Sequence, residues 1–225
     1  MPEYGHRFAQ AAQYAINLHR NQRRKGSDVP YVAHLFGTAS LVAEMGGDED
    51  MAIAGLLHDA IEDHPREGAT KREIGEQFGE DVLAIVKDCT NTHKVAEGDS
   101  GDDSPFVAGK KLYIRHLADL SPRSLTVCLC DKLHNARSTT LDLRANGEAV
   151  WKKFKGGKDS TLWYFRALAG LALETLPHPV LPLLLRDEVL EMHRLGGVQG
   201  IPHLLTPAAL METVGTFVKK KGDAS

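Results

Sequence analysis

The most constraining feature of the sequence is an apolar stretch that runs directly into a cluster of ionisable side chains. Residues 51–63 read MAIAGLL and then HDAIED. A continuous helix here would carry His58 and Glu62 along one line and Asp59 and Asp63 along the next, about 100° around the axis. Because the apolar part belongs inside a globule, the carboxylates would begin at the edge of a core. Burial there costs free energy unless a positive charge compensates it.

The bulk composition excludes several classes of protein. The chain has 225 residues, 42% hydrophobic and 25% charged, which is enough for one substantial core. Its net charge of -3 provides no field for nucleic acid or an anionic membrane. Neither a secretory signal nor an apolar run of the roughly 18 residues needed to span a bilayer is present. Three cysteines without CxxC spacing favour reduced thiols. We therefore expect a cytoplasmic protein with no nucleic-acid or membrane partner.

The hydrophobic pattern is helical throughout, with no alternating stretch long enough for a strand. It predicts an all-α bundle. The expected helices cover residues 8–19, 31–45, 50–63, 70–78, 81–89, 106–120, 125–137, 160–176, 183–195 and 206–220. Residues 92–104 are rich in Gly, Asp and Ser, which predicts an exposed, mobile loop.

Two further residues complete a candidate set of metal ligands. His34 lies on the preceding predicted helix, and the short link at residues 46–48 would pack that helix against the one bearing His58. Asp131 interrupts the apolar run VCLCDKLHN with a carboxylate. Together with His58 and Asp59, these residues offer two imidazoles and two carboxylates, a mixed set that suits Mn²⁺, Fe²⁺ or Zn²⁺. We expect Mn²⁺, with the other two ions as alternatives. The structural alternative is a buried salt-bridge network.

Taken in order, the segments NQRRKGSDVPYVAHL, GLLHDAIEDH and CDKLHN resemble the HD domains of RelA/SpoT alarmone hydrolases, in particular the small stand-alone hydrolases that lack a synthetase domain. The resemblance covers about residues 5–140. It implies an all-α HD fold, a Mn²⁺ ion on the four ligands above, and removal of the 3′-pyrophosphate from (p)ppGpp or a related alarmone. It also implies catalytic roles for Glu62 and Asp63, because a carboxylate can orient or deprotonate the water that a metal activates.

The substrate is expected to meet a basic loop. Arg23, Arg24 and Lys25 precede the helix of the first ligand, where cationic groups could neutralise phosphate oxygens. Such a triplet alone is usually solvated surface, but the resemblance implies nucleotide binding by the Arg and Lys of this loop. Asn135 follows Asp131 by one helical turn and would offer an amide to the ribose or base. The alternative for Asn135 is a polar residue on the helix surface.

Part of the chain departs from the family pattern. Where the family has an acidic and basic run, this chain has AGKK at residues 108–111, for which a helix with exposed lysines is the expected structure. The segment after Leu141 matches poorly. We expect an HD hydrolase domain over residues 1–176 and a C-terminal helical extension over residues 177–225. The extension would pack on the same domain and serve homo-oligomer contacts or pocket closure.

Two other functions stay open at this point. One is an HD phosphohydrolase that acts on another nucleotide or phosphoester. The other is a catalytically silent HD module that only binds a nucleotide. The carboxylates of Glu62 and Asp63 argue against a silent module, because a pure binder of an anionic ligand has no use for two negative charges beside it. Seven other histidines are expected to be structural or surface residues: His19, His64, His93, His116, His178, His193 and His203.

Overall fold

The computed structural model describes residues 4–90 and 103–198. Within these ranges the chain is helical and contains no strand, the one β-type pairing being an isolated bridge between Arg23 and Pro30. The predicted all-α fold class is confirmed. None of the described helices is both long enough and apolar enough to cross a membrane.

The chain divides into two compact units. Unit 1 comprises Met1–Asn91 and Leu120–His134, and unit 2 comprises Thr92–Asp119 and Asn135–Ser225. The expected division of the chain at residue 176 stays a prediction.

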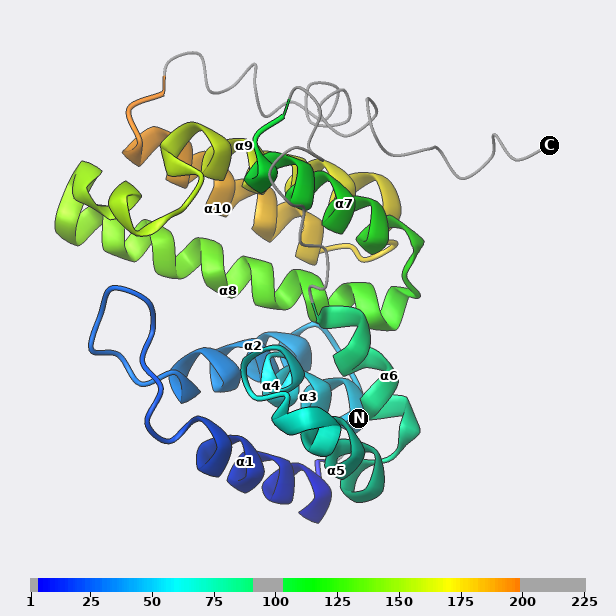
Figure 1. The fold of residues 1–225 in the computed structure, drawn as a ribbon. Coiled ribbons are helices and arrows are strands. Elements are labelled where there is room, and N and C mark those ends of the chain that lie inside the picture. The colour runs from blue at the N-terminus through cyan, green and yellow to red at the C-terminus, as the bar shows by residue number, and fades with distance from the viewer. Residues whose placement is uncertain (1–3, 91–102, 199–225) are drawn as a thin grey trace. The chain divides into compact units, whose positions relative to one another are not determined.

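The helices of unit 1 are seen in Figure 1 in blue to teal. They are α1 (His6–His19), α2 (Val32–Glu44), α3 (Glu49–Leu57), α4 (Ala60–Asp63), the short 3-10 turn η1 (Arg66–Gly68), α5 (Ala69–Phe78) and α6 (Glu80–Cys89). The long helix α8 (Pro122–Asn146) begins in this unit. Unit 2 contains α7 (Pro105–Asp119), the rest of α8, the 3-10 segment η2 (Gly147–Lys153), α9 (Gly157–Thr175) and α10 (Leu181–Leu195).

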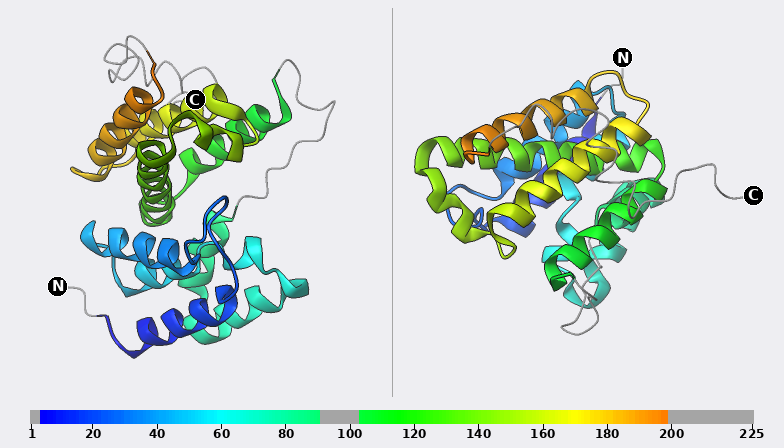
Figure 2. Two further views of the ribbon diagram at one scale, coloured as in Figure 1. Left: turned by 90° about the vertical axis from the view of Figure 1, so that its left-hand side faces the viewer. Right: turned by 90° about the horizontal axis from the view of Figure 1, so that it is seen from above.

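The core of unit 1 is built around α3. Every residue from Met51 to Leu57 is buried, and α3 packs against α1, α2 and α6 (Figures 1 and 2). Asp48 caps the helix by accepting a hydrogen bond from the Met51 amide at 3.0 Å. A Cβ on Gly55 would lie 3.2 Å from the Ala39 Cα, so this glycine lets α2 and α3 approach closely. The apolar stretch seen in the sequence is therefore the central packing element of the unit.

The prediction of one continuous helix over residues 50–63 was wrong. Helix α3 ends at Leu57, and α4 begins at Ala60. The Gly55 carbonyl, which would accept from the amide of Asp59 in an unbroken helix, instead contacts His58 Nδ1 at 2.8 Å. Asp59 takes φ -95° and ψ -4°, and the helical conformation resumes at Ala60 as α4. The side chains of His58 and Asp59, which a straight helix would direct about 100° apart, can therefore face the same point.

Helix α8 also differs from its prediction. The sequence indicated a helix over residues 125–137, whereas α8 continues without interruption from Pro122 to Asn146. Buried residues in its first half, among them Leu125, Leu129 and Leu133, pack into the core of unit 1. The expected mobile loop at residues 92–104 lies almost wholly outside the described residues, and the helix expected at 206–220 lies outside them entirely.

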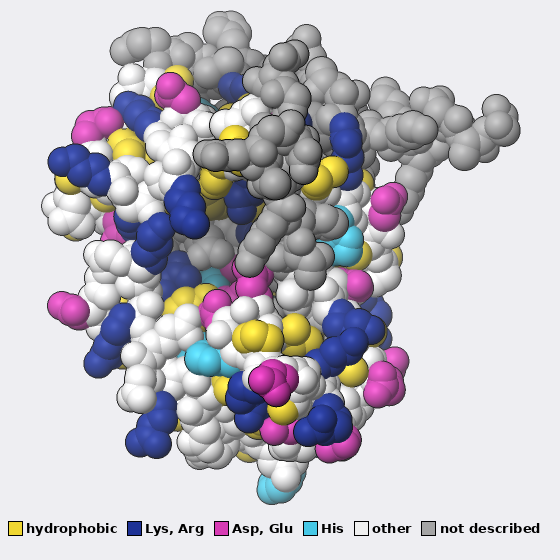
Figure 3. Space-filling view, in the orientation of Figure 1, with side chains coloured by type: hydrophobic (Ala, Val, Ile, Leu, Met, Phe, Trp, Pro, Cys, Tyr) yellow, Lys and Arg dark blue, Asp and Glu magenta, His cyan; other side chains and the backbone are white. Residues whose placement is uncertain are grey.

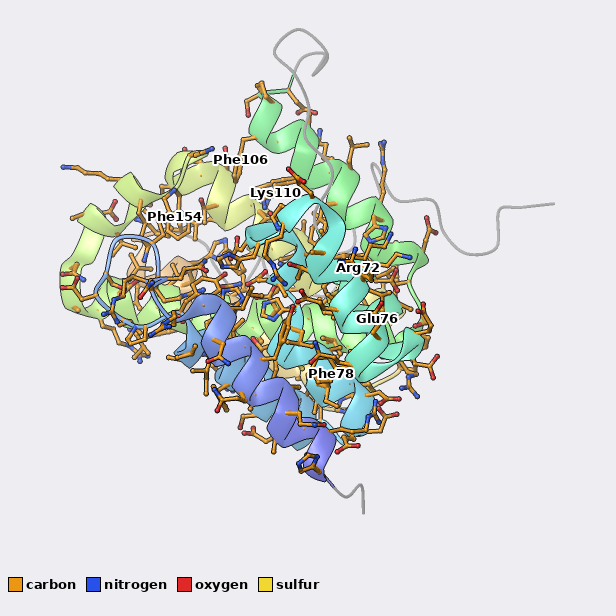
Figure 4. The ribbon with its side chains drawn as sticks, turned by 60° about the horizontal axis from the view of Figure 1, so that its bottom comes forward. Arg72, Glu76, Phe78, Phe106, Lys110 and Phe154 are labelled. Atoms are coloured by element: carbon orange, nitrogen blue, oxygen red, sulfur yellow. The ribbon has the colours of Figure 1, made fainter. Side chains whose placement is uncertain are left out.

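Unit 2 is organised by α9, which packs on α7 and α10 (Figure 2). The Lys110 ammonium, labelled in Figure 4, lies 4.4 Å from the centre of the Tyr164 ring, and Lys111 forms an ion pair with Asp103 at 2.8 Å. Both lysines are half-buried, so the expectation of exposed lysines on this helix was wrong. Over the face of the molecule seen in Figure 3, basic and acidic side chains are interspersed.

Candidate metal centre

Four side chains of unit 1 converge on one point. His34 comes from α2, His58 and Asp59 from the break between α3 and α4, and Asp131 from α8. The Nε2 atoms of the two histidines are 3.1 Å apart. Asp59 Oδ2 lies 3.0 Å from His58 Nε2 and 3.6 Å from His34 Nε2. Asp131 Oδ1 lies 3.1 Å from His34 Nε2 and 3.5 Å from His58 Nε2. We call these four residues the His/Asp cluster.

The cluster is largely removed from solvent. The side chains of His34, His58 and Asp131 are 1%, 2% and 7% exposed, and that of Asp59 is 22% exposed. Residues far apart in the sequence are therefore brought together at the edge of the core, as the sequence predicted for these four positions. Three of them, His34, His58 and Asp59, offer ligand atoms within 4.8 Å of one another.

The ring of His58 is oriented by the helix break. Its Nδ1 lies 2.8 Å from the Gly55 carbonyl oxygen, which can only accept, so Nδ1 carries the hydrogen. In the neutral ring, Nε2 then presents a lone pair to the rest of the cluster. This arrangement is typical of metal-binding histidines, whose second nitrogen donates to a backbone carbonyl or carboxylate.

The ring of His34 is oriented by a third histidine, which the sequence analysis did not single out. His134 lies three residues after Asp131 on α8, and its Nδ1 is 2.9 Å from His34 Nδ1. Burial, together with the positive charges that His34 and Arg24 can carry, lowers the pKa of His134 to about 4. A neutral His134 can accept a hydrogen bond from Nδ1–H of His34. The Nε2 atom of His34 then carries no hydrogen, and its lone pair faces the cluster. The i, i+3 spacing from Asp131 was the available signal.

Gly37 makes room for His134. A Cβ at residue 37 would lie 2.2 Å from the Cδ2 and Nε2 atoms of the His134 ring. Any larger residue would have to push this ring away from α2. Gly37 therefore allows His134 to lie close enough to orient the ring of His34.

Each aspartate of the cluster also has a partner outside it. The Tyr31 hydroxyl donates a hydrogen bond of 2.6 Å to Asp59 Oδ2, and Lys132 forms an ion pair with Asp131 Oδ2. Burial and the neighbouring Asp59 raise the pKa of Tyr31, so its hydroxyl remains a donor. Tyr31 is a second residue that the sequence analysis missed, because a tyrosine at the start of a helix carries no pattern that indicates such a contact.

The electrostatics of the cluster favour a positive charge at its centre. Burial opposes ionisation of His58, but Asp59 and Asp131 outweigh it and raise the pKa of His58 well above its ordinary value. Burial would raise the pKa of Asp59, yet His58 and His34 hold it well below the usual range. Burial acts on Asp131 in the same way, and Lys132 and His58 lower its pKa strongly. A proton or a cation is therefore stabilised at this point.

The donor set fits a divalent ion. Ligand atoms about 2.1 Å from a common ion lie roughly 3.0–3.4 Å apart for octahedral to tetrahedral angles. The imidazole–imidazole and imidazole–carboxylate separations in the cluster are 3.0–3.6 Å. With both Nε2 atoms bare, two nitrogens and two carboxylate oxygens would face one another as acceptors, which a cation between them resolves. The cluster is thus a candidate site for a divalent metal.

The predicted acidic pair lies on the short helix that follows the break. Glu62 and Asp63 are both exposed, near the end of α4. Asp63 Oδ2 accepts a hydrogen bond of 2.7 Å from the Gln22 side-chain amide. The pair is placed within the same unit as the cluster and is open to solvent, where a reactant could reach it.

The predicted basic loop lies between α1 and α2. Arg24 is half-buried, and its guanidinium carbon is 5.7 Å from the centre of the Tyr31 ring. Arg23 and Lys25 are exposed. Of the three, Arg24 is brought to the cluster side of the loop, since Tyr31 also contacts Asp59. Asn135 is half-buried on α8 and belongs to unit 2, so its predicted contact with the substrate stays a prediction.

The helical fold and the His/Asp cluster define an HD domain. Residues 11–159 match the family model described as HD domain, and the chain belongs to this family.

Within the family, the chain is related to small ppGpp hydrolases. It is 35% identical over 131 residues to guanosine-3′,5′-bis(diphosphate) 3′-pyrophosphohydrolase MESH1 of Xenopus tropicalis, over 57% of this chain and 66% of the relative. It is 31% identical over 148 residues to the MESH1 protein of Drosophila melanogaster, over 64% of this chain and 74% of the relative. A solved structure described as a metazoan ortholog of SpoT that hydrolyses ppGpp superposes with a TM-score of 0.66 at 27% identity, covering 87% of this chain and 99% of the other.

Proposed function

We propose that the protein is a metal-dependent pyrophosphohydrolase that removes the 3′-pyrophosphate from (p)ppGpp or a related alarmone nucleotide. The observation that carries the proposal is the convergence of His34, His58, Asp59 and Asp131 within 3.0–3.6 Å across three segments of the chain. Relatives that share this chain's HD domain are named for the same reaction.

In this proposal the four residues of the His/Asp cluster hold Mn²⁺, with Fe²⁺ or Zn²⁺ as alternatives. When bound, the ion acts as a Lewis acid for water and for phosphoryl oxygens. His134 and Tyr31 keep His34 and Asp59 in the orientation that ligation requires, through hydrogen bonds of 2.9 Å and 2.6 Å.

The acidic pair supplies the proton chemistry. Water attacks the phosphorus atom bonded to the 3′-oxygen, and the bond between that phosphorus and the 3′-oxygen breaks. The attacking water loses a proton to Glu62 or Asp63, and the departing 3′-oxygen gains one. Both carboxylates are exposed at the end of α4, which allows them to exchange the proton with solvent afterwards.

The basic loop binds the nucleotide in this proposal. Arg24 is held beside Tyr31 and can direct its guanidinium to phosphate oxygens. Arg23 and Lys25, which are exposed on the same loop, add positive charge around the entering anion. Asn135 is assigned to the ribose or base.

The test is a reaction with defined metal. The purified chain is stripped with a chelator, reloaded with Mn²⁺, Fe²⁺ or Zn²⁺ in separate samples, and incubated with ppGpp and with its adenine counterpart. We expect pyrophosphate and the nucleoside 5′-diphosphate as products, no reaction without metal, and no reaction by the Asp59→Asn variant. Release of phosphate in place of pyrophosphate would select the alternative phosphohydrolase. No product with any of these metals and nucleotides would reject the proposal.

A further inference from the structure

The side chain of Gln22 contacts three other side chains of unit 1, those of Asp63, His19 and His64. Its amide nitrogen lies 2.7 Å from Asp63 Oδ2, and its amide oxygen lies 2.7 Å from His19 Nδ1 and 3.1 Å from His64 Nε2. The residue stands at the start of the basic loop, just after α1. Neither the composition nor the helical periodicity of the sequence distinguishes it from any other polar residue.

The chemistry of these neighbours fixes how the amide must point. The carboxylate of Asp63 only accepts hydrogen bonds, so the amide NH₂ faces it and the amide oxygen faces the two rings. Both rings then donate, which places a hydrogen on His19 Nδ1 and on His64 Nε2. Burial lowers the pKa of His19, which favours its neutral form. The side chain of Gln22 therefore has one consistent orientation, with its donor directed at Asp63.

The backbone of Gln22 is equally constrained. Its amide donates to the His19 carbonyl at 2.9 Å, and its carbonyl accepts from the Tyr31 amide at 3.0 Å. This second bond closes the base of the loop that carries Arg23, Arg24 and Lys25. Tyr31 in turn stacks on His19, with ring centres 5.3 Å apart and planes 17° apart, and donates to Asp59. Gln22 thus lies on a continuous set of contacts from Asp63 to a residue of the His/Asp cluster.

Asp63 needs such a partner. It ends a helix of four residues and its side chain is exposed, so the helix does not hold the carboxylate in one rotamer. Downstream, Arg66 and Glu67 take φ values of 42° and 53°, a left-handed conformation that non-glycine residues rarely adopt. The backbone therefore leaves the right-handed helical conformation within a few residues of Asp63. Within the described residues, the Asp63 carboxylate accepts a hydrogen bond from the Gln22 amide.

We propose that Gln22 is a positioning residue that holds the Asp63 carboxylate in place for proton transfer. The inference rests on the proposed function, because it assigns Gln22 a role in the same reaction. Without the amide, the carboxylate would sample several rotamers, and misplacement of a reacting group by about 1 Å can cost on the order of 10²-fold in rate. Substrate affinity and metal binding depend on other residues and should change little.

The test is a double-mutant cycle between residues 22 and 63. We expect Gln22→Ala to lower kcat by about 10–100-fold with KM and metal content close to those of the wild type. Gln22→Glu keeps the shape but presents a carboxylate to Asp63, and it should lower kcat at least as much. In the Asp63→Asn background, Gln22→Ala should change kcat by less than about twofold, because the group it positions is already gone. Gln13→Ala is the matched control, since Gln13 is exposed on α1 and bonds Asn17 on the same helix.

A second measurement does not depend on activity. The side-chain amide signals of Gln22 in a ¹H–¹⁵N NMR spectrum, assigned by their absence from Gln22→Glu, should shift in Asp63→Asn and stay unchanged in Gln13→Ala. Equal losses from Gln22→Ala in both backgrounds, a tolerated Gln22→Glu, or an effect on KM alone would overturn the positioning role while the proposed function stands. A wild-type protein inert toward every nucleotide would reject the proposed function. In that case, Gln22 amide signals that do not shift in Asp63→Asn would also overturn the inference that Gln22 positions Asp63. Signals that do shift would support that positioning role for whatever reaction the site performs.

Discussion

Two clusters of oppositely charged side chains in this protein have similar nitrogen–oxygen distances but differ in their exposure to solvent. In unit 2, Glu191 accepts from Arg194 at 2.7 Å and from Arg144 at 3.0 Å, and the two arginine side chains are 63% and 55% exposed. In unit 1, the His/Asp cluster has contacts of 3.0–3.6 Å, and its histidine side chains are 1% and 2% exposed. Distance alone does not separate the two clusters. Exposure and charge balance do.

The difference teaches what each cluster is for. The Glu191 cluster has more cations than anions and is screened by water, so it contributes little to stability and needs no further partner. The His/Asp cluster places two carboxylates beside two imidazoles in a site largely removed from water, where their charges call for a proton or a cation between them. Such an arrangement indicates a site for a cation, and substitutions in the two clusters should therefore differ widely in their effects.

Removing a carboxylate from the His/Asp cluster should have the largest effect. We expect Asp59→Asn and Asp131→Asn each to lose bound Mn²⁺ and to lower turnover by at least about 10³-fold, because the remaining donors no longer balance the charge of the ion. Metal content by mass spectrometry and pyrophosphate release measure both effects. Asp142→Asn, on the same helix as Asp131 but paired with Lys153 outside the cluster, is the control and should retain both. Equimolar metal in the Asp59 and Asp131 variants would contradict the assignment.

Neutralising the exposed acidic pair should separate catalysis from binding. The double variant Glu62→Gln, Asp63→Asn should lower kcat by about 10²–10⁴-fold, which is the usual contribution of a positioned acid or base, while metal content stays at the wild-type level. A nucleotide-binding module without activity would be insensitive to the change. Turnover and metal content measured on the same preparation decide between the two.

A mild change next to the cluster should act through geometry alone. Gly37→Ala forces the ring of His134 away from α2, which frees His34 to rotate, and we expect metal affinity to fall by about 10–100-fold. Competition against a chelator of known affinity measures the change. In a His134→Ala background the clash is absent, so Gly37→Ala should then add little. A full additional loss in that background would mean that Gly37 acts elsewhere.

The surface cluster should give the smallest effect. Arg194, with help from Arg144, lowers the pKa of Glu191 from 4.5 to about 2, against the opposing effect of burial. A carboxyl group with a lowered folded-state pKa contributes stability above its unfolded value, so this contribution is complete above pH 4.5 and is lost as the pH falls toward 2. Glu191→Gln should lower Tm at pH 7 by about 2 °C or less. The variant and the wild type should converge in Tm at the acidic end of a calorimetric pH series.

Much of the fold followed from local pattern. Helical periodicity predicted α1, α2, α6, α7, α9 and α10 to within a few residues, because each has an apolar face with a clear break after it. The pattern failed at the end of α3, where the ring of His58 competes for a backbone carbonyl, and in the second half of α8, where packing continues a helix that local sequence does not require. Both failures arise from contacts that a period of 3.6 residues does not encode.

The residues of the candidate site could be predicted from the sequence. His34, His58, Asp59 and Asp131 interrupt apolar segments with polar or charged groups, which are stable in a core only when a partner compensates them. The sequence by itself thus determined the helical class, the central apolar helix and the identity of the cluster. Only the tertiary structure decided how those rings are oriented, through His134, Gly37 and Tyr31, and which amide holds Asp63. These are contacts between residues distant in sequence, and their geometry depends on how whole helices pack.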